Sequence, residues 1–155
     1  MVQQEKSGWC GPAVIQMALA AGGIKKTQSE IAKDVYFGWW GTPQDIIYAY
    51  LSRFFSKIDF KSNATLSDIE THLKTGHIII VNWWDDIDPK DADGHYSLIL
   101  NFQDGLITLA DPSEGRDIWE TGAEKFEKKW YDYLDLRKKK KIKKWMLWLD
   151  PESKI

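Results

Sequence analysis

Cys10 is the only cysteine among the 155 residues of the chain, and it directly precedes a stretch with the pattern of a helix. Apolar side chains recur there at helical spacing: Val14, Met17, Ala18 and Ala21. The pattern predicts a helix over 11–21, with Pro12 in its first turn and Gly22 and Gly23 as its end. Unpaired N–H groups and the helix dipole stabilise negative charge at a helix N-terminus, so Cys10 would be favoured as a nucleophilic thiolate. A buried core cysteine is the alternative.

A nucleophilic cysteine needs a base, usually histidine, and the histidine needs an orienting group. His95 opens an alternating strand and faces away from its apolar side chains, and Ser97 on the same face would leave room for the Cys10 helix. Asp111 ends the next strand, and Gln4 can bring a side-chain amide to the same place as Cys10. A surface histidine and a turn aspartate before proline are the alternatives.

The register of the hairpin between these strands decides whether His95 and Asp111 share a face. An even register, for example Phe102 opposite Leu106, makes them near neighbours. A two-residue turn at 104–105 instead puts them on opposite faces unless a bulge intervenes. The sequence leaves both registers open.

Four motifs in this order resemble the papain-like cysteine peptidases, and most closely the double-glycine leader (bacteriocin-processing) peptidases and their stand-alone relatives. They are Gln4, Cys10 in Cys-Gly-Pro-Ala, His95 in Gly-His-Tyr, and Asp111 in Asp-Pro. The resemblance implies that Cys10 is the nucleophile, His95 the base, Asp111 its orienter and Gln4 the oxyanion donor. It also implies a peptide or protein substrate and no cofactor. The transporter-linked members carry a membrane domain and an ATPase, and neither is present in these 155 residues.

The order of predicted elements indicates an α+β fold that is papain-like, with N-terminal helices packed against a mainly antiparallel β-sheet. Threonine caps predict three further helices, starting at Thr27, Thr42 and Thr65. Alternating or β-branched runs predict strands over 57–61, 78–81, 96–102, 106–110 and 145–149. The run 78–81 is expected to end at Trp83 and Trp84, and a last helix to follow a cap at Thr121. We expect one domain over 1–155.

Composition excludes several classes of protein. No apolar run approaches the ~20 residues of a transmembrane helix, and the polar start of the chain has no signal-peptide pattern. A lone cysteine fits a reducing compartment, so we expect a cytoplasmic protein. One cysteine and three scattered histidines do not have the spacing of zinc ligands, so no metal site is expected.

Charge is unevenly distributed. Seven of the eight residues from Arg137 to Lys144 are cationic, and without them 14 Lys and Arg stand against 23 Asp and Glu, a net of −9. Such a run can contact nucleic acid or an anionic membrane. Its aromatic flanks favour instead a solvated link between the last helix and the last strand.

The nine tryptophans are unusual for this length. Trp9 precedes the nucleophile, and the pairs Trp39-Trp40 and Trp83-Trp84 are expected in or beside loops. One ring of each pair can line a groove for a peptide, so the substrate-binding candidates are Trp9, Trp39, Trp40 and Trp84. Ordinary core and rim packing is the alternative.

These residues together predict a cysteine peptidase or related acyl-transfer hydrolase that cleaves a peptide or amide bond. A catalytically silent papain-like peptide-binding module is the second hypothesis. A binder of anionic polymers, acting through the lysine run, is the third.

Overall fold

The structure, a computed structural model, describes residues 1–38, 41–135 and 137–154. Its helices are α1 (Cys10–Ala21), α2 (Gln28–Val35), α3 (Gln44–Leu51), α4 (Leu66–Lys74), the 3₁₀-helix η1 (Pro89–Asp91) and α5 (Ala123–Lys129). Its strands are β1 (Ile58–Lys61), β2 (Ile78–Asp85), β3 (Asp93–Gln103), β4 (Leu106–Asp111), β5 (Asp117–Gly122), β6 (Tyr131–Tyr133), β7 (Lys141–Lys143) and β8 (Met146–Leu149). None of the helices within these ranges is long and apolar enough to cross a membrane.

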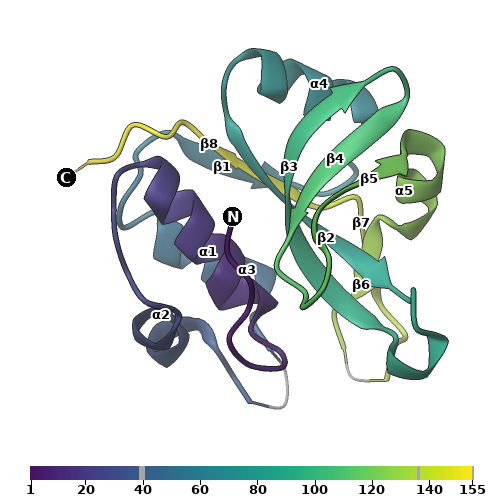
Figure 1. The fold of residues 1–155 in the computed structure, drawn as a ribbon, viewed down its shortest axis with the longest axis horizontal. Helices are drawn as coiled ribbons and strands as arrows, with labels where there is room; N and C mark the ends of the chain where they lie inside the picture. Colours follow the sequence, from purple (N-terminus) through teal and green to yellow (C-terminus); the bar gives the residue numbers. More distant parts are fainter. Residues whose placement is uncertain (39–40, 136, 155) are drawn as a thin grey trace.

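A six-stranded sheet forms the centre of the fold, in the order β1-β8-β2-β3-β4-β5 (Figure 1). Every neighbouring pair in it is antiparallel. Strands β6 and β7 form a separate two-stranded hairpin. Helices pack on the six-stranded sheet, so the α+β class expected from the sequence is confirmed.

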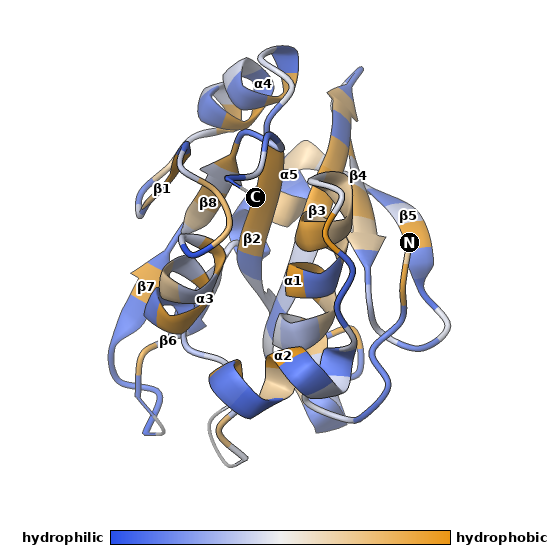
Figure 2. Cartoon of the chain, turned by 90° about the vertical axis from the view of Figure 1, so that its left-hand side faces the viewer, coloured by the Kyte–Doolittle hydropathy of each residue, from blue (hydrophilic) through white to orange (hydrophobic). Residues whose placement is uncertain are grey.

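Both faces of the sheet are covered, which holds the central strands in place. Helices α1, α2 and α3 lie together on one side, and in Figure 2 they stand in front of β2 and β3. Val14 of α1 belongs there to the same buried cluster as Tyr96 of β3. On the other face, Ile69 of α4 and Phe126 of α5 belong to a second buried cluster. A site built on such central strands is more precisely positioned than one built on loops.

Helix α1 begins at Cys10 and ends at the residue before Gly22, as the apolar spacing predicts. Its N-terminal end packs closely on the segment before α3. A Cβ added at Gly11 would lie 2.5 Å from Thr42 Oγ1, so only glycine permits this approach. The contact fixes the end of the helix that carries Cys10.

Of the four predicted threonine caps, those at Thr27 and Thr65 are confirmed and those at Thr42 and Thr121 are wrong. Thr27 Oγ1 accepts from Glu30 N, and Thr65 forms a complete capping box with Asp68. The residue before α3 is Pro43, not Thr42, and this helix has no side-chain cap. Thr42 is 7 % exposed and packs against α1 instead, which takes its hydroxyl away from the start of α3.

The strands extend further than the sequence pattern indicates. Trp83 and Trp84 lie inside β2, which continues to Asp85, so the strand does not end at these residues as expected. Their pairing with β3 and their burial explain the difference, because cross-strand neighbours hold them in the sheet. Thr121 belongs to β5 and does not cap α5, whose preceding residue is Gly122. The sequence did not indicate β5, β6 or β7.

Candidate active site

A bulge in the hairpin of β3 and β4 decides how His95 lies relative to Asp111. The hairpin turns over two residues, Asp104 and Gly105, with φ of 54° and 75°. A regular hairpin with this turn would place His95 and Asp111 on opposite faces. The register shifts between residues 99 and 101, which leaves Leu100 without a cross-strand partner and 46 % exposed. The bulge therefore brings the two functional candidates to the same face.

One expected face assignment is wrong. Ser97 shares the face of His95, but Trp83 fills that face and donates from Nε1 to Ser97 Oγ at 3.0 Å. Helix α1 packs on the opposite face, with Tyr96. Cys10 therefore reaches His95 from the N-terminal end of α1, and not across a space left by Ser97.

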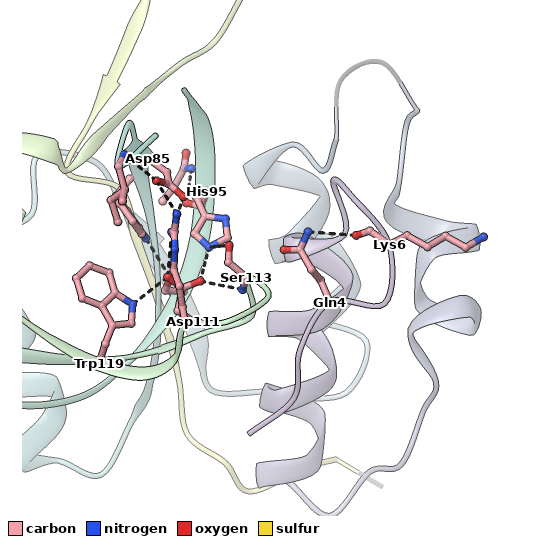
Figure 3. Close-up of polar contacts among 12 residues, drawn as sticks. Gln4, Lys6, Asp85, His95, Asp111, Ser113 and Trp119 are labelled. Atoms are coloured by element: carbon pink, nitrogen blue, oxygen red, sulfur yellow. Dashed lines mark hydrogen bonds and ion pairs between the residues drawn. The ribbon is translucent and has the colours of Figure 1, made fainter. Parts of the chain in front are cut away.

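His95 and Asp111 form a buried ion pair (Figure 3). His95 Nε2 lies 2.5 Å from Asp111 Oδ1, and the residues are 6 % and 0 % exposed. Burial alone would lower the pKa of His95, but hydrogen bonds with Asp111 and Cys10 raise it to about 10. Burial would raise the pKa of Asp111, but the hydrogen bond and charge of His95 lower it to about 2. The pair is therefore an imidazolium and a carboxylate at neutral pH.

Three residues missed by the sequence reasoning hold the Asp111 carboxylate (Figure 3). Trp119 Nε1 donates to Asp111 Oδ2 at 2.9 Å, and Ser113 N donates to Oδ1 at 3.0 Å. Arg116 lies 3.3 Å from Oδ2 and also pairs with Asp85 at the end of β2. Their only signal in the sequence is that they follow Asp111 within eight residues. These contacts orient the carboxylate toward His95.

Cys10 lies at the N-terminus of α1, as predicted, and is partly exposed. A hydrogen bond between Cys10 and His95 is one of the causes that raise the pKa of His95. His95 Nε2 already contacts Asp111 and lies 3.1 Å from Ser113 Oγ, so Nδ1 is the nitrogen left for the thiol. The arrangement can place an imidazolium N–H beside the sulfur, which is the geometry that a thiolate–imidazolium nucleophile needs.

Gln4 lies across from His95 and Asp111, on the N-terminal segment beside α1 (Figure 3). Its main-chain N–H donates to Pro112 O at 2.8 Å, which ties it to the turn after Asp111. Its side-chain Nε2 donates to Lys6 O at 3.1 Å. Gln4 Oε1 is buried and has no hydrogen-bond partner within the described residues. An amide nitrogen carries two hydrogens, so one N–H of Gln4 remains for a ligand.

A cleft of about 580 Å³ opens beside Cys10. The segment before α3 and the hairpin of β6 and β7 supply about half of its described wall. Six aromatic and four acidic side chains lie in the described wall: Tyr36, Phe60, Trp84, Tyr96, Tyr133, Trp145, Asp45, Asp93, Asp132 and Asp135. The volume of the cleft lies in the range of ligand-binding clefts in proteins.

Asp132 is a carboxylate in this wall that the sequence reasoning missed. It accepts from Asn82 Nδ2 at 2.9 Å and from Tyr133 N at 2.6 Å. Burial nevertheless raises its pKa to about 6. A Cβ on Gly94, the residue before His95, would lie 2.0 Å from Asp132 Oδ2. The sequence signal that could have indicated Asp132 is its position between aromatic residues in Trp-Tyr-Asp-Tyr at 130–133.

The structure places the tryptophan candidates for substrate binding differently relative to the cleft. Trp84 lines the cleft, where its ring stacks on Tyr131 at 6.0 Å. Trp9 is 8 % exposed, packs edge-on against Tyr36 and does not belong to the described cleft wall. Trp39 and Trp40 lie outside the described residues.

The cationic run is not a simple link between α5 and β8. Residues 141–143 form β7, which pairs with β6. Two of its lysines lie over aromatic rings beside the cleft, Lys138 over Trp84 and Lys141 over Tyr131. The pairing was not visible in the sequence, because β6 has only three residues.

A scan against protein-family models matches residues 1–137 to the family described as Peptidase C39-like. The chain belongs to the peptidase C39-like family. A relative from Methanothermobacter thermautotrophicus, described as an uncharacterized protein, is 30 % identical over 117 residues, which cover 75 % of this chain and 73 % of the relative.

Solved structures share the C39-like fold at low sequence identity. The peptidase domain of Streptococcus ComA, a bi-functional ABC transporter involved in quorum sensing, aligns with a TM-score of 0.71 and 15 % identity, covering 96 % of both chains. A double-glycine motif protease from an AMS/PCAT transporter, solved in complex with a leader peptide, aligns with a TM-score of 0.61 and 12 % identity. That alignment covers 96 % of this chain and 89 % of the protease. The predicted papain-like resemblance is thereby confirmed at the level of family and fold.

Proposed function

We propose that this C39-like chain is a cysteine peptidase or related acyl-transfer hydrolase that acts on a peptide or amide bond. Cys10 would be the nucleophile, His95 the base, Asp111 its orienter and Gln4 an oxyanion donor. The observation that carries the proposal is the buried His95–Asp111 ion pair. It occupies His95 Nε2 and leaves Nδ1 of the same ring for the Cys10 thiol. A peptide substrate is supported by the aromatic cleft and by the leader peptide bound to the AMS/PCAT protease.

The reaction would proceed by acyl transfer. The Cys10 thiolate attacks the carbonyl carbon, and the carbonyl oxygen becomes an oxyanion held by the Cys10 N–H and the second side-chain N–H of Gln4. As the C–N bond breaks, His95 gives its proton to the leaving amine, and a thioester remains on Cys10. His95 then takes a proton from water, which attacks the thioester and releases the acid and the thiolate.

Substitutions of the proposed nucleophile and oxyanion donor test this reaction. The protein is incubated with a mixture of fluorogenic peptides that includes Gly-Gly sequences, and products are identified by mass spectrometry. Cys10→Ala should remove turnover, and Gln4→Ala should reduce it by about 10²–10³ because one oxyanion donor is lost. Turnover that persists in Cys10→Ala would rule out this nucleophile.

The second candidate is a catalytically silent peptide-binding module. It is favoured by the Gln4 side chain, whose nitrogen already donates to the Lys6 carbonyl. Alkylation by iodoacetamide near neutral pH separates the candidates. Rapid labelling of Cys10 that slows in His95→Ala supports the enzyme, whereas a thiol labelled only on unfolding supports the module.

A further inference from the structure

We infer that Gln28 is a positioning residue that holds Gln4 in place for the oxyanion. The inference rests on the proposed function. It adds to the proposed catalytic residues a positioning residue that does not line the described cleft. Gln28 is the first residue of α2 and is 1 % exposed, an unusual position for an uncharged polar side chain unless its hydrogen bonds are satisfied.

The Gln28 carboxamide brackets Gln4 along the N-terminal segment. Its Nε2 donates to Gln3 O at 2.8 Å, and its Oε1 accepts from Glu5 N at 2.9 Å. The main-chain N–H of Gln4 points the other way and donates to Pro112 O at 2.8 Å. In the middle strand of a β-sheet, the main-chain groups of successive residues point in turn to the strand on one side and to the strand on the other. Residues 3–5 follow this pattern, and the Gln28 carboxamide takes the place of a peptide group in one of the two flanking strands.

The orientation of the Gln28 amide is set by its partners. Nε2 also donates to Gln16 Oε1 at 3.1 Å, and Gln16 Nε2 donates to Lys26 O at 3.0 Å. A flipped amide would face Glu5 N–H with a donor and Gln3 O with an acceptor, so it would lose both bonds. Both N–H groups of Gln28 are used within the protein, and its side chain is therefore a fixed anchor between α1, α2 and the N-terminal segment.

Two anchors on opposite sides thus hold the main chain at Gln4. Gln28 ties it to the helices, and Pro112 ties it to the turn that follows Asp111. This arrangement links the position of the oxyanion donor to the position of the residue that orients the base. A displacement of about 1 Å in a catalytic group can lower the rate about 10²-fold, so loss of one anchor should slow the step that forms the oxyanion.

Two reactions of the same sulfur separate positioning from folding. Acylation of Cys10 by p-nitrophenyl acetate passes through an oxyanion and releases p-nitrophenolate, whereas alkylation by iodoacetamide displaces iodide without one. Gln28→Met should slow acylation by about 10- to 10²-fold and leave alkylation unchanged. If Gln28 acts through Gln4, the double variant Gln4→Ala/Gln28→Met should react as slowly as Gln4→Ala alone.

A matched control and a second variant complete the test. Thr27→Ala removes the cap of the same helix without touching the segment 3–5, so it should lower the melting temperature and leave acylation unchanged. If Gln28→Met does not fold, Gln28→Glu serves instead. It keeps the acceptor for the Glu5 N–H, loses the donor to Gln3 O, and should also slow acylation.

Three results would overturn the inference. In the first, a folded Gln28 variant is acylated at the wild-type rate while Gln4→Ala is acylated slowly. Gln28 then has no part in the reaction, and the proposed function stands. An equal fall in acylation and alkylation assigns Gln28 to the fold alone. Absence of acylation at Cys10 in the wild-type protein overturns the proposed function, and the inference fails with it.

Discussion

Replacing Asp132 by asparagine should change how the stability of this protein depends on pH. Asp132 lies in the cleft wall, where Asn82 and the Tyr133 N–H donate to it and no cation pairs with it among the described ion pairs. Burial raises its pKa to about 6, from an ordinary value of 3.8. The charged form is therefore less favourable in the folded protein than in the unfolded chain.

The size of the effect follows from proton linkage. Between pH 3.8 and about 6 the folded protein binds the Asp132 proton more tightly than the unfolded chain, so its stability falls as pH rises through this window. The rise in the pKa of Asp132 corresponds to roughly 3 kcal/mol in the free energy of unfolding. We take about 2–3 kcal/mol, because Asp132 is partly exposed to solvent. Asparagine does not titrate and removes this penalty.

Urea unfolding at a series of pH values from 4 to 8 measures the effect in both proteins. The free energy of unfolding of Asp132→Asn minus that of the wild type should increase by about 2–3 kcal/mol across the range. The variant amide has one acceptor oxygen for two donors, Asn82 Nδ2 and the Tyr133 N–H, so one donor loses its partner; this cost does not vary with pH and cancels in the comparison. The titrations of groups that do not interact with Asp132 cancel in the same way. A difference that stays constant across the pH range would refute the reasoning.

Three further substitutions test other contacts. Asp111→Asn should lower peptide turnover by about 10²-fold, measured as kcat, because the His95 imidazolium loses the carboxylate that orients and stabilises it. With its pKa lowered to about 2, Asp111 stabilises the fold above pH 3.8, and the wild type should lose this contribution as pH falls toward 2. Gly94→Ala should lower the free energy of unfolding by about 1–3 kcal/mol in urea, because the new Cβ overlaps Asp132. Thr65→Ala should lower it by about 1 kcal/mol without changing turnover, because only the cap of α4 is lost.

Local features of the site were predictable because they depend on neighbouring residues in the chain. The apolar spacing after Cys10 predicts α1 and the place of the thiol at its start, and the structure agrees. The caps at Thr27 and Thr65 are likewise local and confirmed. Thr42 fits the same rule, but its contact with α1 prevails over capping, because tertiary packing takes up its side chain.

The strand pairing was not predictable, because a β-bulge has no reliable sequence mark. The two-residue turn alone would have separated His95 from Asp111, and the extra residue Leu100 reverses that outcome. Asp132 reaches the same cleft from β6, which pairs with a strand inside the cationic run. Such long-range contacts depend on the whole packed sheet and not on spacing along the chain.

The sequence by itself thus determined the family, the α+β class and the four candidate residues, because their types and order along the chain carry that information. Only the tertiary structure decided the relation of these residues in space. It set the face on which α1 packs, the register that joins His95 to Asp111, and the anchors that hold Gln4. The physical reason is that helix starts are fixed by local hydrogen bonds, whereas register and burial are fixed by contacts between distant segments.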